Sequence, residues 1–209
     1  MTESAVRSPR ERIGVLGGTF DPPHQGHAAA VPASIGQLGL SRLHLVVAND
    51  PWQKTADSEI TAAVDRLAMT RAMVEGLPSG PGLVVVDDRE IRRGGPSYMA
   101  DTLAELGDEY PGAELLLLLG TDAAALLDTW VRSHEVRVRA TIVVMHRSGQ
   151  AGGPPSGWRY DTLEADLPEV SSSDLRVRYA AGAAAGCLVP PGVDEVIRER
   201  GLYGVGGSV

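Results

Sequence analysis

Short apolar segments alternate with helix-like segments along nearly the whole chain. The apolar segments are rich in leucine and β-branched residues and show little polar alternation, which is typical of strands buried on both faces. We predict strands at 13–16, 43–48, 83–86, 114–119 and 141–145, and helices at 27–38, 62–75, 98–106, 123–127, 172–181 and 193–200. This order favours an α/β fold, a doubly wound parallel sheet of about five or six strands with helices on both faces.

The sequence predicts one domain over residues 1–209, and its apolar content of 43% is sufficient for a substantial core. Residues 1–11 are expected to form a flexible tail, and residues 171–209 a small C-terminal helical part. The segments 49–60 and 148–157 are expected to be loops, because they are polar or rich in Gly, Pro and Ser. Pro32 should bend or shorten the first helix.

Charge and composition exclude several classes of protein. The formal net charge is −8, which argues against binding nucleic acid over a broad surface. No apolar run is long enough for a membrane span, and the first twelve residues do not resemble a signal peptide, so we expect a cytoplasmic protein. The single cysteine, Cys187, is expected to be a small buried residue without disulfide or metal chemistry.

A glycine-rich segment with two histidines, GGTFDPPHQGH at 17–27, directly follows the first predicted strand. Glycines at a strand end let backbone N–H groups approach a phosphate, and the positive end of the next helix points to the same place. The two prolines stiffen the loop that carries His24 and His27. We interpret the pair as phosphate ligands; a zinc site and structural helix-capping histidines are the alternatives.

This segment closely resembles the signature of the nucleotidyltransferase superfamily, which includes nicotinate-nucleotide, phosphopantetheine and glycerol-phosphate transferases. The resemblance implies a Rossmann-like fold. It also implies that ATP is lined by Gly17, Gly18, Thr19, Phe20, Gly120 and Asp122, with Asp122 toward the ribose. Phe20 is the single phenylalanine of the chain.

A second segment, VSSSDLR at 170–176, combines a helix start with a cation. The spacing of Ser171 and Asp174 fits a capping box, so a helix should begin here and offer free N–H groups to an anion. An ordinary capped helix with a surface arginine is the alternative. The segment is similar to the second superfamily signature, which implies that Ser171, Ser172, Ser173 and Arg176 hold the ATP phosphates, although Ser173 and Leu175 replace the usual Thr and Ile.

Lys54 is the single lysine beside eighteen arginines. A solvated loop lysine is the ordinary interpretation, but so strong a bias suggests that this ammonium is kept to bind phosphate. Its segment, PWQK at 51–54, resembles the phosphate-binding loop of the nicotinate-nucleotide adenylyltransferases.

Two further segments resemble the same family and concern the acceptor. They are RRGGPSYMADTL at 92–103 and the stretch from the GTD at 120–122 to Trp130. The resemblance implies that Trp130 stacks on a pyridine ring and that backbone amides near Tyr98, Met99 and Val131 receive a carboxylate. Met99 replaces the usual Thr. Arg147, after the fifth predicted strand, is a candidate for the acceptor phosphate, with a surface role as the alternative.

The resemblance implies adenylyl transfer from ATP to nicotinate mononucleotide, with release of pyrophosphate and formation of the dinucleotide precursor of NAD. His24, His27, Lys54 and Arg176 would be the catalytic residues, and Mg²⁺ would arrive with ATP, without a metal site or tightly bound organic cofactor of the protein. The alternatives are another phosphate acceptor, namely nicotinamide mononucleotide or pantetheine phosphate, and a non-catalytic nucleotide-binding regulatory domain. We expect no nucleic-acid or membrane partner, and the sequence is compatible with a homo-oligomer.

Overall fold

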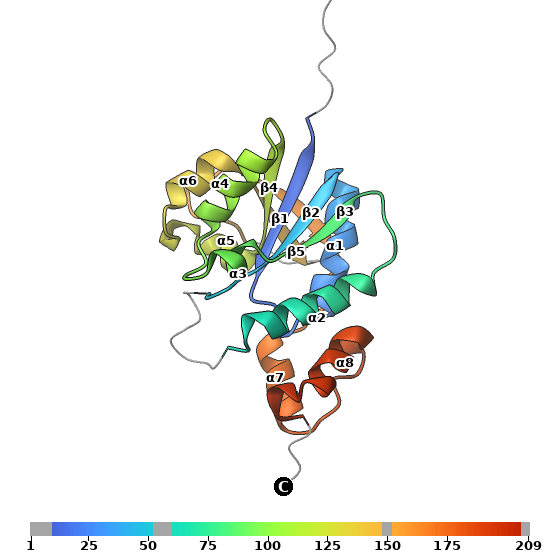
Figure 1. Ribbon diagram of the computed structural model, residues 1–209. Helices are drawn as coiled ribbons and strands as arrows, with labels where there is room; N and C mark the ends of the chain where they lie inside the picture. Colours follow the sequence, from blue (N-terminus) through green and yellow to red (C-terminus); the bar gives the residue numbers. More distant parts are fainter. Residues whose placement is uncertain (1–9, 52–59, 148–151, 206–209) are drawn as a thin grey trace, which may run out of the picture.

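The computed structural model describes residues 10–51, 60–147 and 152–205, which form a six-stranded parallel sheet in the order β3-β2-β1-β4-β5-β6 (Figure 1). The strands are β1 (Arg12–Gly18), β2 (Arg42–Val47), β3 (Leu83–Asp87), β4 (Glu114–Gly120), β5 (Thr141–Arg147) and β6 (Tyr160–Ala165). The predicted α/β fold and all five predicted strands are confirmed. The sixth strand, β6, lies at the edge beside β5.

Eight α-helices connect or follow these strands in the described part of the chain. They are α1 (Gln25–Leu38), α2 (Ala63–Glu75), α3 (Arg89–Arg93), α4 (Met99–Glu109), α5 (Thr121–Ala125), α6 (Ser133–Arg139), α7 (Ser172–Ala180) and α8 (Pro191–Glu199). All six predicted helices are present within a few residues of their expected limits, whereas α3 and α6 were not predicted.

Alternate residues of the central strands enter two separate cores, because successive side chains of a strand point to opposite faces. Leu116 and Leu118 of β4 belong to the core under α1, α2, α7 and α8. Leu115, Leu117 and Leu119 belong to the core under α4, α5 and α6. Figure 1 shows α4, α5 and α6 together on one side of the sheet, with α7 and α8 beside α2. The sheet is therefore covered on both faces, as predicted.

The first helix continues through its proline. α1 runs for 14 residues with Pro32 inside it, so of the two expected effects, bending and shortening, the proline does not shorten the helix. The apolar side of α1, which includes Val31, Ile35 and Leu38, is buried against the sheet. This packing outweighs the hydrogen bond that a proline nitrogen cannot donate, since tertiary burial supplies most of a helix's stability in a folded protein.

Two other expectations need correction. Cys187 is exposed rather than buried. It lies in the short 3₁₀ turn Gly186–Leu188, and the neighbouring Ala185 and Val189 occupy the inward positions instead. Glu11, which we assigned to the flexible tail, accepts the backbone N–H of Glu114 at 2.8 Å.

A buried polar network joins β2, β3, α3 and α4. The carboxylate of Asp87 lies 2.8 Å from Nδ1 of His44 and 2.7 Å from Nε of Arg89. Arg89 also donates to Glu109 at 2.9 Å. Burial by itself would raise the pKa of Asp87, but the hydrogen bonds from His44 and Arg89 outweigh it and lower the pKa to about 2.

The strand order reverses between β1 and β4, and this topology determines where a ligand can bind. Strands β2 and β3 lie on one side of β1, and β4, β5 and β6 lie on the other. In open parallel sheets of this kind, ligands bind beyond the carboxyl ends of the strands where the order reverses. Gly18 and Gly120 are the last residues of β1 and β4, so the predicted glycine-rich segment lies at this crevice. No helix in the described ranges has the length and apolarity needed to cross a bilayer.

Candidate active site

The turn after β1 is tightly packed on itself. Phe20 adopts a left-handed conformation, with φ of 52°, which costs a residue other than glycine about 1 to 2 kcal/mol. Its ring lies where a side chain at Gly18 would be, because a Cβ there would approach two ring atoms to 2.9 Å. The ring also meets the imidazole of His27 edge-on, with centroids 5.0 Å apart. Phe20 therefore supports the turn from within, and it is buried rather than open to a ligand.

His24 and His27 form a reciprocal cap at the start of α1. Nδ1 of His24 accepts the backbone N–H of Gly26 at 3.1 Å, and Nδ1 of His27 accepts the backbone N–H of His24 at 3.2 Å. The alternative that these are helix-capping histidines is therefore correct for their Nδ1 atoms. Because Nδ1 is the acceptor in both neutral rings, the proton of each lies on Nε2. The cap thus fixes the tautomer that makes Nε2 a donor.

Both histidines line one pocket, which we call the histidine pocket. The two imidazole centroids are 3.9 Å apart. The pocket is lined by Leu16, Gly17, His24, Gly26, His27, Ala30, Gly120, Thr121, Asp122, Met145, Leu167 and Val170. Four segments that are distant in sequence thus meet here, and the predicted Gly17, Gly120 and Asp122 are among them. In the described part of the chain, no group of three or more His, Cys, Asp or Glu side chains could hold a metal ion.

A second pocket adjoins the first at the same turn, and we call it the tryptophan pocket. It is lined by Gly17, Gly18, Thr19, Ala48, Pro51, Glu90, Ser97, Tyr98, Met99, Leu119, Ala123, Trp130 and Val131. Gly17 lines both pockets. The predicted acceptor residues Tyr98, Met99, Trp130 and Val131 are thus brought together, and the predicted Gly18 and Thr19 lie here rather than in the histidine pocket.

Two features of the tryptophan pocket suit a flat, negatively charged ligand. The indole ring of Trp130 lines the pocket and offers an aromatic face, while its Nε1 is buried without a hydrogen-bond partner among the described residues. The helix α4 begins at Met99, and no side chain caps its first turn. Its positive end therefore favours an anion at the pocket.

The second predicted motif lies against the first one. α7 begins at Ser172, and Ser171 caps it by accepting the N–H of Asp174 at 3.4 Å, as predicted. Arg176 donates to the backbone carbonyl of Asp21 at 2.8 Å and to Oγ of Ser173 at 3.3 Å. Ser172 donates to the carbonyl of Pro22 at 2.9 Å. The motif therefore holds the loop that leads into His24. Its Val170 lines the histidine pocket, whereas the predicted Ser171, Ser172, Ser173 and Arg176 are not among the lining residues.

The end of the described chain also binds this loop, which the sequence did not indicate. The hydroxyl of Tyr203 donates to Oδ1 of the buried Asp21 at 2.6 Å, and the backbone N–H of Thr61 donates to Oδ2 at 3.2 Å. Burial and the Asp21 carboxylate both raise the pKa of Tyr203 well above its usual value. Tyr203 therefore remains a neutral donor across the physiological range.

Two predicted site residues are not placed by the structure. Lys54 lies outside the described residues, and so does the side chain of Arg147, whose backbone ends β5. Two buried residues near the site were missed. Glu90 lies in the tryptophan pocket and accepts from Oγ1 of Thr102 at 2.5 Å. Arg66 of α2 is 1% exposed and binds backbone carbonyls of the site loops. A charged residue among the mostly apolar positions of the buried face of α2 was the available signal for Arg66.

Three features define the class of this protein: a parallel sheet whose strand order reverses between β1 and β4, the glycine-rich turn, and the paired histidines. They define a nucleotide-binding α/β protein of the nucleotidyltransferase class. The cytidylyltransferase-like family profile matches residues 15–178. A probable nicotinate-nucleotide adenylyltransferase of Saccharopolyspora erythraea is 40% identical over 94% of this chain and 91% of its own length. One of Albidiferax ferrireducens is 37% identical over 92% of this chain and 98% of its own. The chain therefore belongs to the cytidylyltransferase-like family. Its similarity to these two relatives places it among the nicotinate-nucleotide adenylyltransferases of that family.

Solved structures show the same fold at low sequence identity. The nicotinic acid mononucleotide adenylyltransferase of Plasmodium falciparum, complexed with NaAD, superposes with a TM-score of 0.74 at 16% identity and covers 95% of this chain and 100% of its own. A putative nicotinate-nucleotide adenylyltransferase from Vibrio parahaemolyticus gives a TM-score of 0.68 at 18% identity, covering 93% of this chain and 96% of its own. The Rossmann-like fold is thus shared over nearly the whole chain.

Proposed function

We propose that this protein transfers the adenylyl group of ATP to nicotinate mononucleotide, releasing pyrophosphate and forming nicotinate adenine dinucleotide. The observation that carries the proposal is the meeting of the histidine pocket and the tryptophan pocket at Gly17. One pocket offers imidazole donors to a phosphate chain, and the other offers an aromatic ring and a helix N-terminus to a flat anion. The activity of its relatives agrees with this assignment.

The reaction requires no general base. The attacking group is a phosphate monoester oxygen, whose second pKa is about 6, so it is already ionised at neutral pH. This oxygen forms a bond to the α-phosphorus of ATP. At the same time the bond between that phosphorus and the α,β-bridging oxygen breaks, and its electron pair leaves with pyrophosphate. The protein has to bring two polyanions together in line and to neutralise the developing charge.

We assign the histidines to the phosphates of ATP. Each Nε2–H would donate to a phosphate oxygen, with His27 near the α-phosphate, where negative charge builds up. We propose that Lys54 and Arg176 hold the β- and γ-phosphates; Arg176 has five N–H donors, of which Asp21 and Ser173 accept two. Gly120 and Asp122 would line the nucleoside, with Asp122 toward the ribose. ATP would be taken as its Mg²⁺ complex, since Mg²⁺ binds through substrate phosphates and keeps several waters.

The tryptophan pocket supplies a reason to prefer an acid over an amide. Trp130 would stack on the pyridine ring, and the first amides of α4 at Tyr98 and Met99, with the amide of Val131, would receive the carboxylate. A carboxamide is neutral and gains less from the positive end of a helix. Met99 stands where the family usually has Thr. Because we assign the contact with the carboxylate to the backbone N–H of residue 99, this exchange of side chain should not weaken it. Arg147 remains our candidate for the acceptor phosphate, and the cytoplasm our proposed location.

The test is a coupled assay of pyrophosphate release with three acceptors. We expect turnover with nicotinate mononucleotide, a lower kcat/KM with nicotinamide mononucleotide, and none with pantetheine phosphate. Preference for either of the other acceptors would overturn the acceptor assignment. Binding of ATP without pyrophosphate release from any acceptor would indicate a regulatory nucleotide-binding domain instead.

Replacing Trp130 with alanine should raise the KM for nicotinate mononucleotide about tenfold, because the loss of stacking and of buried aromatic area costs about 1.4 kcal/mol. The KM for ATP should change by less than about twofold. Trp130→Phe keeps a stacking face and serves as the matched control, with a KM near that of the wild type. An equal rise of both KM values in Trp130→Ala would show that the ring has a general structural role instead.

A further inference from the structure

The guanidinium of Arg66 binds three backbone carbonyls from two loops, the one after β1 and the one between β2 and α2. Nη1 donates to Thr19 at 2.8 Å, Nη2 donates to Asn49 at 2.9 Å, and Nε donates to Thr61 at 2.8 Å. Thr19 follows β1, Asn49 follows β2, and Thr61 precedes α2. The planar fork of an arginine suits this task, because its five N–H groups point in fixed directions.

Burying this side chain is expensive. Arg66 is 1% exposed, and burial lowers its pKa, an effect that the nearby Asp21 carboxylate offsets only in part. A leucine or methionine in this position would avoid this cost but would leave the carbonyls of Thr19, Asn49 and Thr61 without this donor. The charged group is therefore kept for the three hydrogen bonds that it makes.

One hydrogen bond of Arg66 acts on the histidine pocket. The carbonyl of Thr19 belongs to the peptide that leads into Phe20, the residue with a φ of 52°. Holding this carbonyl opposes the relaxation of a strained residue. The Phe20 ring meets His27, whose imidazole lines the histidine pocket. Arg66 is thus connected to His27 through two successive contacts.

Another hydrogen bond of Arg66 acts on the tryptophan pocket. Asn49, whose carbonyl Arg66 holds, donates its own N–H to Oγ of Ser97 at 2.8 Å and its Nδ2–H to the carbonyl of Gly95 at 2.9 Å. Ser97 and the adjacent Tyr98 line the tryptophan pocket. A single buried side chain therefore connects the supports of both pockets.

We propose that Arg66 is a positioning residue that sets the placement of the histidine pocket relative to the tryptophan pocket, and thereby the in-line approach of the two substrates. The proposal rests on the proposed function, and it adds a residue that touches neither substrate. Transfer between two bound substrates depends steeply on their mutual geometry, and a displacement of about 1 Å can lower the rate about 100-fold. Arg66 lines neither pocket, so we expect its substitution to leave the binding contacts inside each pocket in place.

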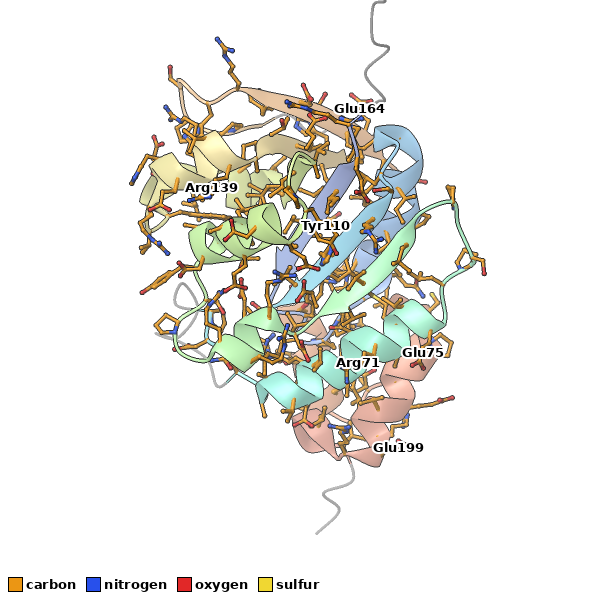
Figure 2. All side chains as sticks on the ribbon, turned by 45° about the horizontal axis from the view of Figure 1, so that its top comes forward. Arg71, Glu75, Tyr110, Arg139, Glu164 and Glu199 are labelled. Carbon is orange, nitrogen blue, oxygen red and sulfur yellow. The ribbon has the colours of Figure 1, made fainter. Side chains whose placement is uncertain are left out.

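The variant Arg66→Lys tests this proposal, because an ammonium cannot donate to three separate carbonyls in the geometry of the fork. We expect kcat to fall between about tenfold and 100-fold, while the KM for ATP and for nicotinate mononucleotide each change less than about threefold. The matched control is Arg71→Lys. It carries the same substitution on the same helix, at a side chain that is 54% exposed and labelled in Figure 2, and it should behave as the wild type.

A second control separates positioning from a loss of stability. Met73 of α2 is 1% exposed and lines neither pocket, so Met73→Ala should lower the free energy of unfolding by about 2 to 5 kcal/mol and leave kcat unchanged well below its melting temperature. A normal kcat in Arg66→Lys, a parallel rise of both KM values, or an equal loss of kcat in Met73→Ala would each overturn the inference. An inactive wild-type protein would overturn the proposed function and the inference with it, whereas an active wild type with an equally active Arg66→Lys would overturn the inference alone.

Discussion

Replacing His27 with alanine lowers kcat for adenylyl transfer about 100-fold, which is the effect of removing one preorganised donor from a developing negative charge. The donor is Nε2–H, whose proton is fixed there because Nδ1 accepts the N–H of His24. The interaction strengthens as charge builds on the α-phosphate, so the loss should fall on kcat, with a smaller change in the KM for ATP. Steady-state kinetics with nicotinate mononucleotide at saturating ATP measures it.

Because His27→Ala also removes half of the helix cap, a second variant is needed. Asparagine places its Oδ1 near the position of Nδ1 and keeps an acceptor for the His24 N–H, but it has no counterpart of Nε2. His27→Asn should therefore retain the melting temperature better than His27→Ala and be similarly slow. His134→Ala, at an exposed histidine of α6, is the matched control and should be fully active. A kcat within threefold of the wild type in His27→Asn would refute the assigned role.

Asp87→Asn should lower the free energy of unfolding by about 3 kcal/mol at neutral pH. The substitution keeps the shape of the side chain but leaves the buried Arg89, which is 8% exposed, with Glu105 and Glu109 as its remaining ionic partners among the described residues. Removing one partner of a buried pair is strongly destabilising because the other charge stays desolvated. Urea unfolding at pH 7 measures the change.

The same network predicts an acid-labile component of stability. The pKa of Asp87 is about 2 in the folded protein, below its ordinary value of 3.8, so its contribution is fully present above about pH 4 and is lost as the pH falls toward 2. The shift corresponds to about 2 kcal/mol. In Asp87→Asn this part of the pH dependence should disappear, so the difference in stability between wild type and variant should shrink from about 3 kcal/mol at neutral pH to about 1 kcal/mol near pH 2.

The neighbouring Asp88→Asn provides the control. Asp88 also pairs with an arginine, at 2.7 Å from Nε of Arg92, but the two side chains are 33% and 69% exposed. Exposed pairs contribute between zero and about 1 kcal/mol, so Asp88→Asn should cost less than that and leave the acid limb unchanged. Equal effects of the two substitutions would contradict the assignment of the stability to the buried network.

The strands that the sequence predicts are those with continuous apolar sequences, whether they are buried in the interior or, as β3, partly exposed at an edge. The interior strands β1, β2, β4 and β5, with the edge strand β3, are apolar runs, and all were predicted. β6 has the sequence YDTLEA, in which only Leu163 and Ala165 are buried, so an edge strand of this kind resembles a polar loop. α3 and α6 are short and rich in charged residues, and they carry no helical apolar period. The formation of α3 and α6 depends on tertiary contacts, which cannot be read from the local sequence.

The residues of the candidate site also fall into those that the sequence predicts and those that it does not. Residues within one local motif, such as His24 and His27, could be placed together because a strand end and a helix start fix them. Arg66 and Tyr203 could not, since their partners are the backbone of distant loops and a carboxylate in a turn. Gly18 and Thr19, which the resemblance assigns to ATP, lie in the tryptophan pocket beside the predicted acceptor residues. Which side of a turn faces which ligand depends on tertiary packing.

The hydrogen bond between Tyr203 and Asp21 joins residues 182 positions apart. Synthesis on the ribosome proceeds from the N-terminus. The residues of β1, the two histidines and the other residues that line both pockets are therefore made before Tyr203. Asp21 must wait for its partner until residue 203 has been made. A chain cut short of Tyr203 would therefore carry the residues that line both pockets and still lack this support of the turn.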